Sequence, residues 1–378
     1  MDDALSNDVH AAESTEAYHR AVPTPTNANG LPEFARAPTT GDLTPFIAAL
    51  VGGRTLERGE SQAAFESLMS GECHPAEIGA LLALLATRVP TADELAGAAT
   101  VMRAHVDPVD TGVAADALLD TAGTGGTTKL FNVSTAAAII AAAAGAKVAK
   151  HGNRSRTGRG SAEVLMELGV HVDAGRETQR RCMDEAGICF CFAIHHHPAT
   201  RHVMPVRKAL GIPTIFNLLG PLTNPAGAKR QIVGVYAPQF VRPVADALAM
   251  LGAVRAVVVH GTDGLDECSI TSPTMIADVQ NGVVTERLLS TSELGFPVAS
   301  HADLAAGDLA GAAQLLTAIL TGSERGPRRH MAVANAGLAI MAAGLAANVS
   351  VGIQLAEAAI DSGGAAQTLE RLRTASRH

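Results

Sequence analysis

The pattern of hydrophobic and polar positions divides the chain near residue 110. Between about residues 42 and 110, apolar residues recur at i, i+3 and i+4, and glycine, proline or Ser/Thr residues separate the repeats. The third repeat, HPAEIGALLALLATR, carries few charges on any face, so we expect part of it to meet a partner. The pattern predicts a small helical domain over residues 41–112, with helices over residues 43–53, 58–72, 74–88 and 91–105.

From about residue 115, short apolar runs alternate with helical patterns. Such alternation is typical of α/β proteins with a largely parallel sheet. We therefore predict an α/β fold class, in which the small N-terminal helical domain precedes a larger α/β domain with a mostly parallel central sheet, over residues 113–378. The predicted strands are ALLDTA (117–122), KVAKH (147–151), ICFCFA (188–193), QIVGVY (231–236) and RAVVVHG (255–261).

Composition narrows the class of protein. The chain has 378 residues, and its formal net charge of −8 argues against a general nucleic-acid binder, which would carry a basic excess. Residues 1–40 are polar and acidic, which predicts a disordered N-terminal extension. The longest apolar run is shorter than the roughly 20 residues of a membrane-spanning helix. We expect a cytoplasmic protein that binds neither nucleic acid nor membrane.

The stretch DTAGTGGTTKLFNVST, residues 120–135, joins the first predicted strand to a helix. Its glycines permit positive φ and let backbone amides point at one spot, and its polar residues lie where the helix begins. Helix N-termini favour anions through their unpaired N–H groups. An ordinary tight turn with a helix cap remains an alternative. The residues concerned are Gly123, Gly125, Gly126, Asn132, Ser134 and Thr135.

The second loop, KHGNRSRTGRGSAE, follows the next predicted strand. Right-handed crossover geometry places it beside the first loop. It combines flexible glycines with Lys150, Arg154, Arg156 and Arg159, and such a cluster of cations suits a polyphosphate. A solvated basic loop is the alternative, but it does not account for Lys-His-Gly-Asn at the end of a buried strand.

Two further loops carry polar chemistry. The first is HHHPATRHVMPVRKALG, residues 195–211, whose three adjacent histidines are a poor metal site because neighbouring side chains seldom converge on one ion. Arg207, on the helix that follows, is the better candidate for a binding residue, and its ligand would be a carboxylate. In HGTDGLDECS, residues 260–269, Asp266 and Glu267 offer the oxygen ligands that Mg²⁺ prefers when it also binds phosphate. Alone, such an acidic pair is usually solvated.

Together these motifs give the chain a family resemblance. GTGG…FNVST, KHGNRS, GIPTIFNLLGPLTNPAG and DGLDE, in this order, resemble anthranilate phosphoribosyltransferase. The resemblance implies transfer of the phosphoribosyl group from phosphoribosyl pyrophosphate (PRPP) to anthranilate, which gives N-(5-phosphoribosyl)anthranilate and pyrophosphate, the second step of tryptophan biosynthesis. It also implies Mg²⁺ as cofactor and a homodimer joined through the helical domain, which a helix near residues 200–211 completes.

The resemblance assigns roles by position. Lys150, Asn153 and Arg207 are the implied catalytic residues, and Arg207 pairs with the anthranilate carboxylate. Ser134, Asp266 and Glu267 are the implied magnesium ligands. The implied substrate-binding residues are Gly123, Thr124, Gly125, Gly126, Asn132, Ser134, Thr135 and Lys150 for PRPP, and His151, Gly152, Asn153, His197 and Arg207 towards anthranilate.

Two departures from the family pattern keep alternatives open. The family has Asp and Gly after GTGG, whereas this chain has Thr127 and Thr128, and the arginine-rich loop is about one residue short. The change makes both loops more positive, which could strengthen pyrophosphate binding or weaken a second metal site. It could also mark another acceptor. The alternatives are a related phosphoribosyltransferase or nucleoside phosphorylase, and a non-catalytic nucleic-acid-binding relative.

Overall fold

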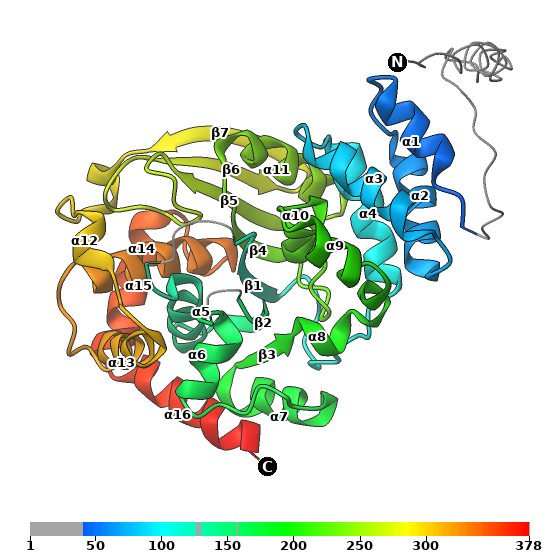
Figure 1. Cartoon of the computed structure of the whole chain (residues 1–378). Coiled ribbons are helices and arrows are strands. Elements are labelled where there is room, and N and C mark those ends of the chain that lie inside the picture. Colours follow the sequence, from blue (N-terminus) through cyan, green and yellow to red (C-terminus); the bar gives the residue numbers. More distant parts are fainter. Residues whose placement is uncertain (1–40, 126–129, 156–157, 378) are drawn as a thin grey trace, which may run out of the picture. The chain divides into compact units, whose positions relative to one another are not determined.

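The chain begins, within the part that the structure describes, with a group of helices. The computed structural model describes residues 41–125, 130–155 and 158–377 (Figure 1). Thr91 begins α4 with a capping box, in which its side chain accepts from Glu94 N and the Glu94 carboxylate accepts from Thr91 N. All four predicted helices are confirmed, with ends that differ by a few residues. They are α1 (Thr44–Val51), α2 (Arg58–Ser70), α3 (Pro75–Ala86) and α4 (Ala92–Ala104).

The rest of the described chain is built on a seven-stranded sheet, in the order β3-β2-β1-β4-β5-β6-β7. The first five strands in this order are mutually parallel, and β6 and β7 are antiparallel to their neighbours. The predicted fold class is therefore confirmed. The strands are β1 (Leu118–Gly123), β2 (Lys147–Gly152), β3 (Ile188–Phe192), β4 (Arg230–Gly234), β5 (Arg255–Gly261), β6 (Thr274–Gln280) and β7 (Val283–Leu289).

The hairpin of β6 and β7 was absent from the predicted elements, although the sequence contains its signal. Asn281 and Gly282 join the two strands, with φ of 50° and 81°. Two-residue hairpin turns of this kind need positive φ at both positions, for which Asn-Gly is the preferred pair. The hairpin extends the parallel sheet beyond β5.

Helices cover both faces of the sheet (Figure 1). On one face, α5 packs against α14, α15 and α16. On the other, α11 lies over β5 and β6 and also contacts α4. The helices after β1 are α5 (Val133–Ala143), α6 (Ser161–Glu167), α7 (Arg176–Ala186), α8 (Ala193–His196), α9 (Met204–Leu210), α10 (Ile215–Leu222), α11 (Val241–Met250), α12 (His301–Leu304), α13 (Leu309–Leu320), α14 (Pro327–Ala342), α15 (Val349–Asp361) and α16 (Gly364–Arg377), with 3₁₀ turns η1 (Pro198–His202), η2 (Pro238–Phe240) and η3 (Thr291–Leu294).

The first four helices share a hydrophobic core with one face of the sheet. Phe65 and Leu81 belong to the same buried cluster as Val233 of β4, Val258 of β5 and Leu248 of α11. The short helix α9 packs on α3, and η1 packs on α2. In the segment after β3, α8 stays against the strand, whereas η1 and α9 join the N-terminal helices. Within the residues that the structure describes, none of the helices has the length and apolarity required to span a membrane.

Candidate active site

The four loops singled out in the sequence follow β1, β2, β3 and β5. Because these strands are parallel, their carboxyl ends lie at one edge of the sheet (Figure 1). Ligands of α/β proteins bind outside this edge. The fold therefore brings the four loops to the same side of the sheet, and their side chains decide what they can bind there.

The glycine turn after β1 is joined to the end of β4. Thr124 N donates to Gly234 O at 2.9 Å, and Thr124 Oγ1 accepts from Tyr236 N at 3.0 Å. Gly125 has φ of +62°, which favours glycine. Gly126 and the segment with Thr127, 126–129, lie outside the described residues, as does Arg156. The consequence of the missing aspartate stays a prediction.

The acidic pair after β5 lies against this turn. A β-carbon at Gly123 would be 3.3 Å from Asp266 Oδ2, and a β-carbon at Gly234 would be only 1.7 Å from Asp266 O. Glycine at these two positions lets the Asp266 backbone approach β4 and its carboxylate approach the turn. Asp266 and Glu267 carry carboxylates and Ser134 a hydroxyl, which are oxygen donors of the kind that Mg²⁺ takes together with substrate phosphates and water.

The N-terminus of α5 contributes buried polar atoms. Asn132 is 2 % exposed, and its Nδ2 donates to Arg159 O at 3.1 Å, which ties the first loop to the second. Among the described residues, Asn132 Oδ1 and Thr135 Oγ1 are buried without a hydrogen-bond partner. Ser134 accepts at its backbone oxygen from Thr121 Oγ1 at 2.8 Å. Because buried polar atoms without partners are costly, these two atoms indicate a site completed by a ligand or water.

Lys150 lies beneath the turn and is 2 % exposed. Its Nζ donates to Thr121 O at 2.6 Å and lies 3.2 Å from Thr121 Oγ1. Asp120, fully buried, accepts from His151 N at 2.9 Å. Burial raises the pKa of Asp120 to about 6, although the positive charge of Lys150 opposes the shift. A buried cation and a buried carboxyl group therefore lie together under the glycine turn.

His151 and His197 form a neutral pair. Their Nε2 atoms are 3.2 Å apart, and His151 Nδ1 lies 3.2 Å from Gly220 O. The carbonyl can only accept, so His151 donates from Nδ1 and accepts at Nε2 from His197. Burial, with the neighbouring histidine, lowers the pKa of His151 to about 3; burial, with His196, lowers that of His197 to about 4. At neutral pH the pair is an uncharged surface.

The second loop leaves β2 through a tightly packed glycine. A β-carbon at Gly152 would be 2.3 Å from Ser161 Oγ and 2.6 Å from the Phe190 ring. Asn153 follows, exposed, and its Oδ1 accepts from Arg154 N at 2.8 Å. The Asn153 side chain is thus positioned by its own loop and not by the histidine pair.

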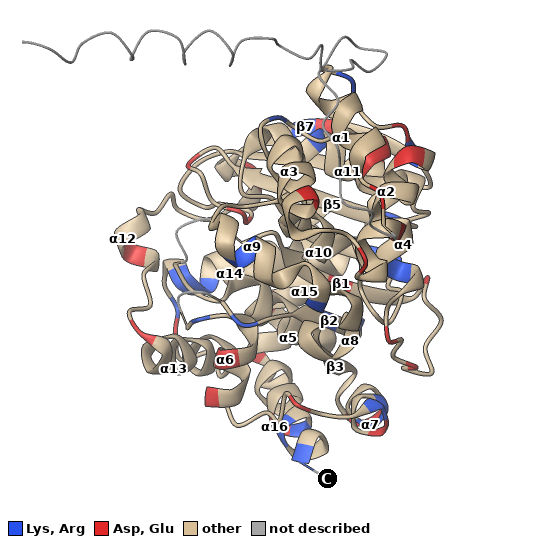
Figure 2. Cartoon of the chain, turned by 45° about the vertical axis from the view of Figure 1, so that its right-hand side comes forward, with Lys and Arg blue, Asp and Glu red and all other residues tan. Residues whose placement is uncertain are grey.

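Arg207 lies on α9 and is half-buried. Its guanidinium is 4.9 Å from the centre of the Phe216 ring on α10, and burial lowers its pKa. The same helix α10 offers Gly220 O to His151, so α10 connects Arg207 to the histidine pair. Basic residues lie beside α9, near β2 and near α6, and also far from the site (Figure 2).

The three consecutive histidines have three different partners. His195 Nε2 is 2.9 Å from Asp173 Oδ1, and His196 Nδ1 is 2.9 Å from Asp107 O. His197 pairs with His151. The three rings therefore point apart, and only His197 belongs to the site.

Several residues of the site were missed by the sequence reasoning. Asn224 Nδ2 donates to Ala149 O at 2.8 Å. Asn335 accepts at Oδ1 from Cys268 N and donates from Nδ2 to Cys268 O, directly after the acidic pair. Asp120 of β1 accepts from His151 N of β2, and Asp263, two residues after β5, accepts from Ser269 Oγ. For Gly234 there was a signal, since glycine inside a strand often marks a close approach of another backbone.

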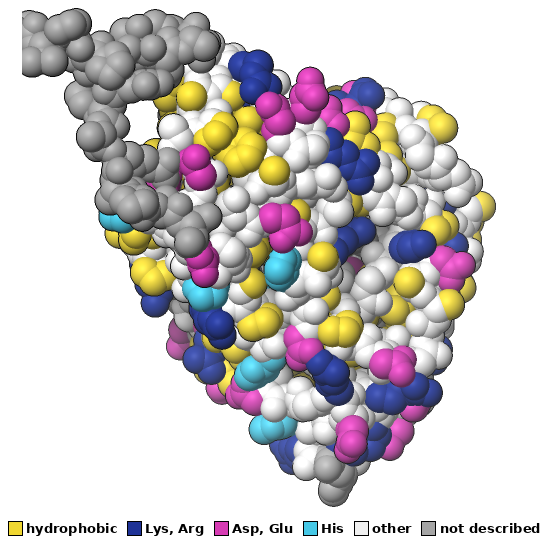
Figure 3. Space-filling view, turned by 90° about the vertical axis from the view of Figure 1, so that its right-hand side faces the viewer, with side chains coloured by type: hydrophobic (Ala, Val, Ile, Leu, Met, Phe, Trp, Pro, Cys, Tyr) yellow, Lys and Arg dark blue, Asp and Glu magenta, His cyan; other side chains and the backbone are white. Residues whose placement is uncertain are grey.

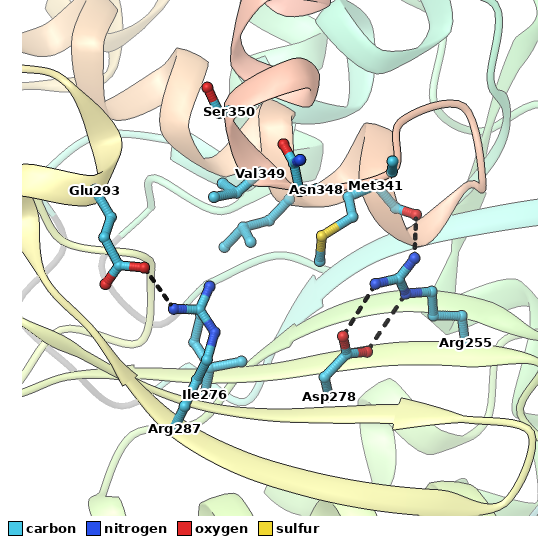
Figure 4. Close-up of a pocket in the computed structure, with 11 residues that line it drawn as sticks. Arg255, Ile276, Asp278, Arg287, Glu293, Met341, Asn348, Val349 and Ser350 are labelled. Carbon is cyan, nitrogen blue, oxygen red and sulfur yellow. Dashed lines mark hydrogen bonds and ion pairs between the residues drawn. The ribbon is translucent and has the colours of Figure 1, made fainter.

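A separate cavity of about 440 Å³ lies between β5, β6 and the start of α15 (Figure 4). Its arginines are paired with carboxylates, Arg255 with Asp278 at 3.0 Å and Arg287 with Glu293 at 2.9 Å. The charges there are balanced, and the four loops contribute no lining residue. This cavity is not the candidate active site.

Comparisons with known proteins identify the family. Residues 44–106 match the helical bundle domain of the glycosyl transferase family, and residues 115–366 match its a/b domain. The chain is 47 % identical to anthranilate phosphoribosyltransferase from Rubrobacter xylanophilus, across 89 % of this chain and 98 % of that protein. The chain belongs to the anthranilate phosphoribosyltransferase family. The family and enzyme class predicted from the motifs are thereby confirmed.

Solved structures of family members agree. The enzyme from Thermus thermophilus has a TM-score of 0.82 at 39 % identity, over 88 % of this chain and 99 % of that one. The enzyme from Saccharomyces cerevisiae in complex with PRPP and Mg has a TM-score of 0.79 at 26 % identity, over 88 % and 97 % of the two chains. The same yeast enzyme is also known in complex with 4-fluoroanthranilate.

Proposed function

We propose that the protein transfers the phosphoribosyl group of PRPP to anthranilate and releases pyrophosphate, in the second step of tryptophan biosynthesis. One observation carries the proposal: the Asp266 carboxylate lies against the glycine turn, where a β-carbon at Gly123 would be 3.3 Å from it. Carboxylates beside a phosphate-binding turn repel the phosphate unless a cation lies between them. A Mg²⁺ ion bound to the pyrophosphate group of PRPP would lie between the carboxylate and the phosphates and so remove this repulsion.

The pyrophosphate end of the site uses the first and fourth loops. The amides around Gly123–Gly125 and the buried polar atoms of Asn132 and Thr135 hold the leaving group, and Lys150 supplies positive charge beneath it. Ser134, Asp266 and Glu267 hold Mg²⁺, which, when bound, stabilises the negative charge that develops on the departing pyrophosphate. These residues act chiefly by preorganised charge stabilisation.

The acceptor end uses the histidine pair and Arg207. His151 and His197 are uncharged at neutral pH, and their rings, inclined to each other by 46°, offer an uncharged aromatic contact to the ring of the acceptor. Arg207 binds the anthranilate carboxylate through its fork of N–H donors, and Asn153 lines the path of the acceptor. The anthranilate nitrogen then bonds to the anomeric carbon as the bond to pyrophosphate breaks, and the amine loses one proton. A neutral aryl amine attacks without a strong base, so positioning supplies the remaining rate enhancement.

The assembly and organisation of the protein remain part of the proposal. We propose a homodimer joined through a helical domain of residues 41–112, completed by the helix near residues 200–211, and a PRPP-binding domain of residues 113–378. The packing of α9 on α3 supports the inclusion of α9 in the helical domain, and the 51 % exposure of Val51 on α1 supports an interface there. We propose a cytoplasmic location.

A fluorescence assay of anthranilate consumption tests the function. We expect consumption only when PRPP and Mg²⁺ are both present, and no consumption under any condition would contradict the proposal. The double variant Asp266→Ala/Glu267→Ala should lose at least a hundredfold in kcat/KM because the metal loses both carboxylates. The control is Asp246→Ala on α11, which breaks an exposed ion pair with Arg242 and should leave activity unchanged. Near-normal activity of the double variant would show the acidic pair to be a solvated turn.

A further inference from the structure

One segment outside the family motifs touches three of the loops at the site. We call residues 299–307, which include α12, the bracing segment (Figure 1). It reaches the loop after β1, the loop after β2 and the loop after β5. Its contacts are Ala306 N to Leu130 O at 3.1 Å, Arg159 Nη1 to Gly307 O, Ala299 N to Ile270 O at 3.2 Å, and His301 Nε2 to Asp263 Oδ2 at 2.9 Å.

The bracing segment is fixed by contacts of its own. Leu304 is fully buried in the core of the α/β domain. Ser300 begins α12 with a capping box, in which its backbone N donates to Asp303 Oδ2 at 2.9 Å and its hydroxyl to the same atom at 2.7 Å. Because Leu304 and the helix cap hold the segment in addition to its contacts with the loops, the segment can serve as a support for them.

His301 reaches the acidic loop through Asp263, three residues before Asp266. The Asp263 side chain is 13 % exposed, and its Oδ2 accepts from Ser269 Oγ at 2.7 Å and from Thr271 Oγ1 as well as facing His301. Thus Asp263 ties the residues before the acidic pair to those after it. Of these three contacts of Asp263 Oδ2, the one with His301 comes from a distant part of the described chain, and the other two come from the same loop.

We propose that the bracing segment positions the pyrophosphate end of the site, and that His301 is the positioning residue through which it orients the Asp266–Glu267 loop. This inference rests on the proposed function. His301 itself touches neither substrate nor metal in this arrangement. It acts by holding Asp263, so its removal changes none of the metal-binding side chains but lets the loop that carries two of them, Asp266 and Glu267, move.

Two substitutions at His301 test the inference. His301→Ala removes the contact, and we expect the Mg²⁺ concentration for half-maximal activity and the KM for PRPP to rise three- to tenfold, with the KM for anthranilate within twofold of wild type. His301→Gln places a donor near the former Nε2 and should restore most of the loss. Hydrogen exchange of the amides in residues 262–272 should be faster in the alanine variant.

The control is His105→Ala, which removes a histidine 40 % exposed and 2.9 Å from Glu66, away from the glycine turn. It should leave Mg²⁺ and PRPP dependence unchanged. Wild-type Mg²⁺ dependence in His301→Ala, equal losses for both substrates, or unchanged exchange in residues 262–272 would each overturn the inference. An inactive wild-type protein would overturn the proposed function, and the exchange measurement would still decide whether His301 holds the loop.

Discussion

At the scale of single residues, the site depends on positions where a side chain is absent as much as on those where one is present. Gly234 and Gly123 leave room for the backbone and the carboxylate of Asp266. Neither glycine binds anything through a side chain, so what each one approaches is visible only once β1, β4 and β5 are placed side by side. The sequence showed which side chains could bind a ligand, but it did not show which backbones would lie in contact.

We predict that Gly234→Ala lowers kcat/KM at least a hundredfold. The new β-carbon would lie 1.7 Å from Asp266 O, so the acidic loop must move away from the glycine turn. Overpacking of this kind also costs about 1–3 kcal/mol of stability, which urea unfolding measures. Gly59→Ala is the control, because a β-carbon there meets nothing within 4 Å. Full activity of Gly234→Ala would mean that Asp266 does not need its present position.

A second residue-scale prediction concerns Arg207. Arg207→Lys keeps the charge but removes the planar fork that binds a carboxylate through two N–H groups. We expect the KM for anthranilate to rise about tenfold or more and the KM for PRPP to change less than twofold, measured by steady-state kinetics. Lys208→Arg, at an exposed neighbouring position, should change neither value. A larger effect on PRPP than on anthranilate would assign Arg207 to the other substrate.

At the scale of elements, local patterns predicted most strands and helices but not their partners. RAVVVHG was predicted as a strand and forms β5 with the same bounds, Arg255–Gly261. The hairpin of β6 and β7 was missed because its alternating pattern follows a long loop, despite the Asn-Gly turn. The contact of Asn335 on α14 with Cys268 spans 67 residues, and no local pattern encodes such a pairing.

The burial of His151 at the end of β2 and of its partner His197 predicts that the protein loses stability in acid. His151 and His197 have lowered pKa values, so between pH 6.5 and about 4 the unfolded chain binds protons that the folded chain excludes. Stability therefore falls as pH falls, by about 2 kcal/mol per histidine from pH 7 to pH 5. Asp120 has the opposite effect on stability. Because its pKa is raised to about 6, the folded state binds a proton at a higher pH than the unfolded chain does, which adds stability as pH falls.

Urea unfolding at pH 7 and pH 5 checks this balance. Burial also lowers the pKa of His196 to about 4, so three histidines outweigh one carboxyl group, and we expect the wild-type protein to lose a few kcal/mol at pH 5. His197→Gln should lose less between the two pH values, since one buried imidazole is gone. His171→Gln is the control, because His171 is exposed. An equal loss in the wild type and in His197→Gln would show that the pair is protonated without cost.

At the scale of the whole molecule, the N-terminal helices have two surfaces with different roles. One surface shares a core with α11 and the sheet, through residues such as Phe65 and Leu81. The face seen in Figure 3 carries hydrophobic groups among charged ones. On α1, Val51 is 51 % exposed, and Ile47, one turn earlier, is partly exposed. Clustered apolar residues on a surface commonly mark a protein–protein interface.

We predict that the protein is a dimer and that Ile47→Asp/Val51→Asp makes it a monomer. The two positions are four residues apart on α1, so they lie on one face of the helix, and two carboxylates there cannot be buried against a second copy without a large desolvation cost. Sedimentation velocity at micromolar concentration measures the change, and circular dichroism checks that the helices remain.

Val283→Asp is the control, since Val283 is 63 % exposed on β7, outside the N-terminal helices. A wild-type monomer, or a dimer that survives the double substitution, would place the interface elsewhere or remove it. If the dimer dissociates while kcat/KM for anthranilate stays unchanged, each subunit holds a complete site, as the arrangement of the four loops within one chain implies.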